Sequence, residues 1–130
     1  MVRLTLDAVQ PAGATRPMVN AHELMDRLDG DCQFLIELTE IFRREYPRQV
    51  GLIRQAIDQG DAPGLKRASH ALKGALTSLS ACQARESAAH LEEMGATGNL
   101  QGARAGLHNL EGELIKTVES LDKLGGEAGQ

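Results

Sequence analysis

The chain has 130 residues, a formal net charge of −4, one tyrosine, two phenylalanines and no tryptophan. Its length predicts a single domain and excludes a complete ATP-dependent kinase or a large two-domain enzyme. Because aromatic side chains are so few, the core must be built from Leu, Ile, Val, Met and Ala, which favours packed helices over a β-sandwich. The acidic charge balance disfavours general binding to nucleic acids.

The cysteine content and the apolar pattern indicate the compartment. Cys32 and Cys82 are too few for a disulfide framework and are expected to be free thiols in a reducing environment. No apolar run approaches the ~18–20 residues that a membrane-spanning helix needs. Residues 1–19 also lack the apolar block of a signal peptide. We therefore expect a cytoplasmic domain that makes no membrane contact.

The first predicted elements are an arm and a short helix. Proline and glycine interrupt residues 1–19, which we interpret as an N-terminal arm or linker. From there onward the apolar residues follow a helical period. Asn20 and Glu23 have the spacing of a capping box and predict a short helix that stops at Gly30.

A long helix is predicted next. Asp31 can cap its start, and Gly60 ends it. Pro47 lies inside this segment and is expected to kink or break the helix. Its apolar residues follow a helical spacing, and they are Phe34, Leu35, Leu38, Ile41, Phe42, Val50, Ile53 and Ile57. Of these, Phe34, Leu38 and Phe42 are expected to pack in the core.

Three further helices complete the pattern. Asp61 at an N-cap position and Pro63 in the first turn begin a helix that runs to about residue 80. The apolar spacing then places a helix at about 83–96. A last helix follows a turn and is expected to end at the glycine pair 125–126.

Short loops between long amphipathic helices predict antiparallel neighbours. The expected fold is therefore all-α, an up-and-down antiparallel four-helix bundle with a short additional N-terminal helix. The bundle is expected to cover residues 20–124, with a flexible tail at 125–130.

The helix predicted at 62–80 carries a histidine outside its apolar face. At 100° per residue, its apolar residues fall within about 100° of one another, and they are Leu65, Ala68, Leu72, Ala75, Leu76 and Leu79. His70 points the opposite way and is expected to be exposed, with Lys66, Arg67 and Lys73 within one turn. From Lys66 to Arg85 the chain has four basic and no acidic residues, which suits an anionic ligand or adduct.

Gly74 lies one turn after His70 on the same face. A glycine inside a helix costs about 1 kcal/mol relative to alanine, so its presence needs a reason. We expect that the missing side chain leaves space for the imidazole and for close approach of another molecule. The simpler interpretation is a tolerated glycine or a local kink.

The segment His70-Ala71-Leu72-Lys73-Gly74 resembles the His-x-x-Lys-Gly signature of histidine-containing phosphotransfer (HPt) domains of bacterial phosphorelays. The upstream segment 28–31, the turn at Gly60-Asp61 and the downstream pair Leu91-Glu92 are also similar to the family pattern, and the resemblance covers about residues 24–121. Ser80 departs from this pattern because a glycine is common there, and Ala84 stands where a larger apolar residue is common.

The resemblance implies a phosphoryl carrier in which His70 accepts a phosphoryl group from a receiver-domain aspartate and passes it to another receiver. Lys73 would stabilise the phosphoryl charge, Gly74 would provide steric clearance, and Lys66 and Arg67 would assist or steer an acidic partner. No nucleotide-binding motif is present in the sequence, so autonomous kinase activity is not expected. No cofactor is expected in this chain, since the Mg²⁺ would belong to the receiver. The partners would be receiver domains, including those of hybrid sensor kinases, and a monomer is expected.

Two other functions remain open at this stage. The first is a helical module that docks a receiver or histidine kinase without being phosphorylated. The second is a metal or redox bundle, although the three remaining histidines lack zinc-helix spacing and lie on three different predicted helices, at His22, His90 and His108. Glu92 and Glu93 are interpreted as part of a solvated helix face.

Overall fold

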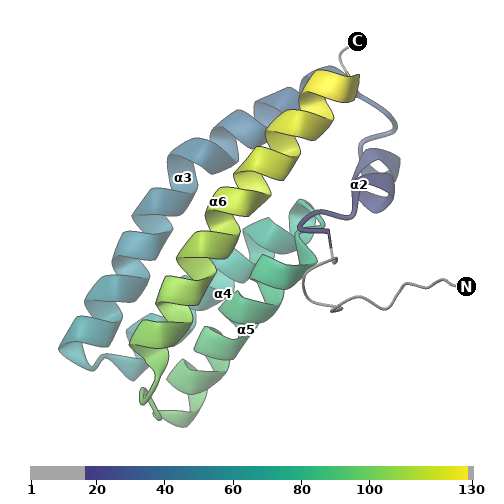
Figure 1. Cartoon of the computed structure of the whole chain (residues 1–130). Coiled ribbons are helices and arrows are strands. Elements are labelled where there is room, and N and C mark those ends of the chain that lie inside the picture. The colour runs from purple at the N-terminus through teal and green to yellow at the C-terminus, as the bar shows by residue number, and fades with distance from the viewer. Residues whose placement is uncertain (1–16, 129–130) are drawn as a thin grey trace, which may run out of the picture.

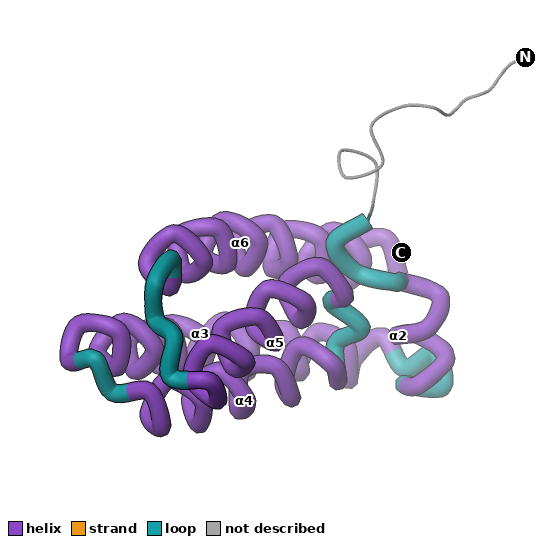
Figure 2. The backbone as a smooth tube through the Cα atoms, turned by 90° about the horizontal axis from the view of Figure 1, so that it is seen from below, coloured by secondary structure: helices purple, strands orange, loops and turns teal. Residues whose placement is uncertain are grey.

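The computed structural model describes residues 17–128, and this part of the chain contains five α-helices and no strand. The helices are α2 (Ala21–Arg27), α3 (Cys32–Gln59), α4 (Ala62–Ser78), α5 (Cys82–Thr97) and α6 (Ala103–Ala128). Contacts join α3 to α4, α4 to α5, α5 to α6 and α6 back to α3. These four helices therefore form an up-and-down bundle with α2 beside one end (Figure 1), and Figure 2 shows the connecting loops at the bundle ends. The predicted fold class is confirmed.

Side-chain caps begin three of the helices where the sequence predicted them. The Asn20 side chain accepts a hydrogen bond from the backbone N–H of Glu23 at 3.0 Å. The side chains of Asp31 and Asp61 likewise accept hydrogen bonds at 3.0 Å, from the backbone N–H groups of Phe34 and Gly64, respectively. Each cap satisfies one of the amide groups that a helix leaves unpaired at its start.

Pro47 does not break α3. The helix is continuous from Cys32 to Gln59, so of the two predicted effects of Pro47, a kink or a break, the break is wrong. Pro47 is exposed, whereas Phe42 and Val50 on either side of it are buried in the common core. Packing of both halves against the same neighbours outweighs the loss of one backbone hydrogen bond at the solvent side.

The glycine pair near the C-terminus does not end α6 either, because the helix continues to Ala128. Gly125 is buried, and a Cβ at this position would lie 3.5 Å from Cγ1 of Ile36 on α3. Tertiary packing therefore extends the helix through residues that disfavour it, and residues 125–128 are helix rather than a tail. Residues 129–130 lie outside the described part of the chain.

The core is built mainly from leucine, as the composition predicted. Leu65, Leu72 and Leu76 of α4 are fully buried. Phe42 is buried as expected, but Phe34 and Ile41 are 44% and 49% exposed, so the prediction of core packing is wrong for Phe34. Phe34 and Ile41 are seven residues apart and therefore lie on the same face of α3. The neighbouring helices do not cover this part of the α3 surface.

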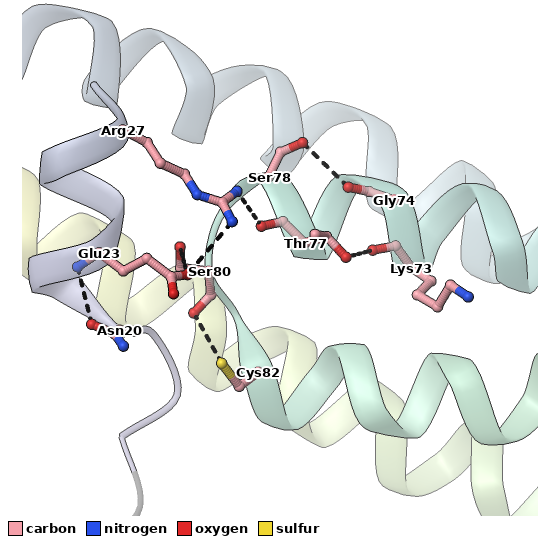
Figure 3. Close-up of polar contacts among 9 residues, drawn as sticks. All are labelled: Asn20, Glu23, Arg27, Lys73, Gly74, Thr77, Ser78, Ser80 and Cys82. Atoms are coloured by element: carbon pink, nitrogen blue, oxygen red, sulfur yellow. Dashed lines mark hydrogen bonds and ion pairs between the residues drawn. The ribbon is translucent and has the colours of Figure 1, made fainter. Parts of the chain in front are cut away.

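A polar joint connects α2 to the end of α4 (Figure 3). Ser80 has a left-handed backbone with φ of 55°, at the position where the HPt pattern favours glycine. Its hydroxyl donates to Glu23 at 2.7 Å, and its carbonyl accepts from the N–H of Asn20 at 2.9 Å. Arg27 donates to the carbonyl of Thr77 at 2.8 Å, which places a cation at the C-terminal end of α4. The joint holds the end of the helix that carries His70.

The last residues of the expected arm pack on the bundle. Val19 is buried, and the carbonyl of Pro17 accepts a hydrogen bond from Gln83 at 3.1 Å. The remainder of the expected arm, residues 1–16, lies outside the described part of the chain. Cys32 and Cys82 form no disulfide bond, as predicted. Within residues 17–128, none of the helices is both long and apolar enough to cross a membrane.

Candidate functional site

His70 lies near the middle of α4 on the side opposite the buried leucines. Its side chain is 67% exposed, while Leu65 and Leu72 on the same helix are fully buried. The exposed position predicted from the helical phase is therefore confirmed. A buried stripe holds α4 against the bundle, so the imidazole is presented on a rigid element.

A carboxylate from the neighbouring helix contacts the imidazole. Oε2 of Glu92 on α5 lies 2.8 Å from Nδ1 of His70. The other carboxylate oxygen, Oε1, lies 2.7 Å from Nζ of Lys73. One carboxylate thus joins the histidine and the lysine of the His-x-x-Lys-Gly motif, and its side chain is only 17% exposed.

Gly95 explains how Glu92 reaches this position. Gly95 is one turn further along α5, and a Cβ there would lie 2.5 Å from the backbone nitrogen of Lys66 and 2.8 Å from the carbonyl oxygen of Ala62. A side chain would clash with the backbone of α4, so glycine permits the close approach of the two helices. That approach brings Glu92 within hydrogen-bond distance of His70.

The contacts define the ionisation of the carboxylate and the tautomer of the imidazole. The hydrogen bond from Lys73, followed by that from His70, lowers the pKa of Glu92 below its ordinary value of 4.5, and these effects outweigh the desolvation that raises it. An ionised carboxylate only accepts hydrogen bonds. We therefore assign the proton of a neutral His70 to Nδ1, which leaves a lone pair on Nε2 at the opposite edge of the ring.

Two cations remain available beside the histidine. Lys66 and Arg67 are exposed and line, with Pro63, His70 and Glu92, an open cleft of about 540 Å³. Within the described part of the chain, neither cation forms an ion pair. Lys73, in contrast, is held by Glu92. The segment from Lys66 to Arg85 has only basic charged residues in the sequence, but in the folded protein the carboxylate of Glu92 adds one negative charge to it.

Gly74 is exposed, and a Cβ at this position would meet no atom within 4 Å. Packing within the described part of the chain thus provides no reason for glycine here, in contrast to Gly95. The expectation that Gly74 leaves space for another molecule stays a prediction.

Two residues of this site, Glu92 and Gly95, were not predicted from the sequence. The interpretation of Glu92 as solvated is wrong, because α4 covers most of its side chain, whereas Glu93 is exposed as expected. The available signal was the helical phase, since Glu92 lies between Leu91 and Gly95, which are both buried, on the flank of the packed face of α5. Gly95 falls within the helix predicted at about 83–96, but no role was predicted for it, although it allows α5 to approach α4.

The other histidines lie away from the cluster that the sequence analysis singled out. His22, His90 and His108 are all exposed and belong to α2, α5 and α6, respectively. Across residues 17–128, no group of three or more His, Cys, Asp or Glu side chains is placed to hold a metal ion.

Comparison with known proteins adds one match. The family model described as the Hpt domain matches residues 37–123, which is more than half of the chain and includes His70, Lys73 and Glu92. Searches of curated proteins and of solved structures find no match.

Proposed function

Because the chain belongs to the Hpt domain family, whose members take part in phosphorelay signalling, we propose that His70 accepts a phosphoryl group from a receiver-domain aspartate and passes it to another receiver aspartate. The observation that carries the proposal is the exposed imidazole whose Nδ1 is bound by Glu92 at 2.8 Å. This contact leaves the lone pair of Nε2 free to act as the nucleophile.

The transfer step requires little chemistry from this chain. The lone pair of Nε2 bonds to the phosphorus atom, and the bond between phosphorus and the aspartyl oxygen of the receiver breaks. The electron pair of that bond stays on the aspartate, which leaves as a carboxylate. Phosphoryl transfer depends mainly on positioning and on stabilisation of charge. The Mg²⁺ that assists it would be held by the acidic pocket of the receiver.

The surrounding cations support the same role. A phosphoryl group brings about −1.5 to −2 charges to the site, and Lys73 lies one turn from His70 to neutralise part of this charge. To do so, its ammonium group must share its contact with Glu92 or leave it. Lys66 and Arg67 border the cleft beside the ring and add positive potential for the phosphoryl group or for an acidic partner.

The test is transfer from receiver domains phosphorylated with a radioactive label. We expect label on the wild-type protein, stable to base and labile to acid, as a phosphoramidate is. His70→Gln removes the nucleophilic nitrogen at an exposed position, so label should vanish while the free energy of unfolding changes by less than about 0.5 kcal/mol.

Label that persists on His70→Gln would assign the acceptor to another residue. Binding of a receiver to the wild-type protein without any transfer of label would instead identify a docking module.

Lys73→Ala tests the second residue of the motif. Transfer should become slower, or the adduct should decay faster, because a cation that stabilises the phosphoryl oxygens is lost. Activity should not be abolished, since Lys66 and Arg67 remain beside His70. Transfer kinetics equal to those of the wild-type protein would remove Lys73 from the mechanism and leave His70 in place.

A further inference from the structure

The carboxylate of Glu92 remains beside His70 after the phosphoryl group has arrived. Its Oε2 contacts Nδ1, the ring nitrogen that does not form the new bond in the proposed reaction. When Nε2 bonds to phosphorus, the ring retains the proton on Nδ1 and carries a formal positive charge. A carboxylate next to that N–H stabilises the charged ring, in the way that a buried aspartate stabilises an imidazolium in a hydrolase triad.

We propose that Glu92 keeps the proton on Nδ1 of phosphorylated His70, so that the histidine leaves as a neutral imidazole when the phosphoryl group moves to the next receiver. This inference rests on the proposed function and assigns Glu92 a role in the onward step. Glu92 acts through His70 and is a positioning residue in this role.

The onward step shows why the proton matters. A carboxylate oxygen of the acceptor receiver attacks phosphorus, the bond between Nε2 and phosphorus breaks, and its electron pair returns to Nε2. With a proton on Nδ1, the leaving group is a neutral imidazole. Without that proton, the leaving group is an imidazolate anion, which holds the phosphoryl group far more tightly. A group that retains the proton therefore keeps the carrier competent for transfer.

The charged groups around the ring come from two helices. On α4 they are Lys66, Arg67 and Lys73, and their positive charges disfavour a positive charge on the phosphorylated ring. On α5 the facing group is Glu92, which favours it. The neighbouring groove beside Arg67 receives only uncharged side chains from α3, namely Leu52, Gln55, Ala56 and Gln59. Asp61 also borders that groove, but it caps the start of α4 more than two turns before His70.

Glu92→Gln separates the charge from the contact. The amide oxygen can still accept from Nδ1, but the negative charge that retains the proton is gone. Glu93→Gln is the matched control, because it makes the same change at the next residue, which is exposed. Each protein is phosphorylated by a labelled receiver and then isolated. Its phosphohistidine is titrated by ³¹P NMR from about pH 5 to about pH 9, the range in which imidazole groups titrate.

We expect the midpoint of this titration to lie about one pH unit lower for Glu92→Gln than for the wild-type protein. At pH values above both midpoints, onward transfer to one common receiver should be about tenfold slower for Glu92→Gln than for the wild-type protein. At low pH the rates of the two proteins should converge. Glu93→Gln should follow the wild-type curve. Lys73→Gln, which removes the other partner of Glu92, should not lower the midpoint, because it removes a cation rather than an anion.

The alternative outcomes separate the two proposals. The rates of onward transfer by Glu92→Gln and by the wild-type protein could instead differ by the same factor at every pH. That result would show that Glu92 acts only by holding Lys73 or by repelling the phosphoryl group, and it would overturn the inference. An unchanged midpoint would overturn it as well. Both results would leave His70 as the acceptor. Failure of the wild-type protein to take label from any receiver would overturn the proposed function itself.

Discussion

Gly95 on α5 and Lys66 on α4 meet backbone to backbone, so closely that a Cβ on Gly95 would lie 2.5 Å from the Lys66 nitrogen. The contact lies one turn from the pair formed by Glu92 and His70. The separation of these two helices is therefore set at the place where the candidate site needs it.

Gly95→Ala should destabilise the fold and loosen the site. The added methyl group would meet backbone atoms rather than a flexible side chain, and overpacking of this kind costs about 1–3 kcal/mol. Denaturant unfolding measures the cost, and ¹⁵N NMR of the imidazole reports the loss of the contact with Glu92. Gly112→Ala is the control, because a Cβ there meets nothing within 4 Å and alanine favours a helix. Equal stability of the two variants would show that α4 and α5 can separate without cost.

Gly74→Gln should leave the fold intact and impair transfer. The position is exposed with open space around it, so the free energy of unfolding should be unchanged or rise by up to about 1 kcal/mol. A bulky side chain one turn from His70 would, however, obstruct an approaching receiver. Circular dichroism and the rate of transfer measure the two effects separately. A wild-type rate of transfer would contradict the role of Gly74 in steric clearance.

The lowered pKa of Glu92 predicts an acid-dependent loss of stability. A carboxylate whose pKa is lower in the folded state contributes stability above its unfolded pKa, near the ordinary value of 4.5, and loses it as the pH falls through the folded pKa. The wild-type protein should therefore be more stable than Glu92→Gln at pH values above 4.5, and the difference should shrink below that value. Urea unfolding of both proteins at several pH values tests this. A difference that is independent of pH in the acidic range would show that the carboxylate charge does not stabilise the fold.

Local patterns were sufficient to predict the helices and the exposed face of α4. The caps at Asn20, Asp31 and Asp61 and the helical phase of His70 depend on residues within one or two turns, and each of them was predicted. The same local rules failed at Pro47 and at Gly125. There, burial of neighbouring side chains against other helices outweighed a propensity cost of a few kcal/mol.

The identity of the histidine's partner could not be derived from such patterns. Glu92 lies 22 residues from His70 in the chain, and its carboxylate reaches the imidazole only because Gly95 lets α5 approach α4. The face on which a side chain lies follows from the twist of its own helix, which is a local property. The atom that it contacts depends on the distance between two helices, and side-chain volume at the contact determines that distance. His70 could thus be recognised from the sequence, whereas the charge that holds its Nδ1 became visible only in the folded chain.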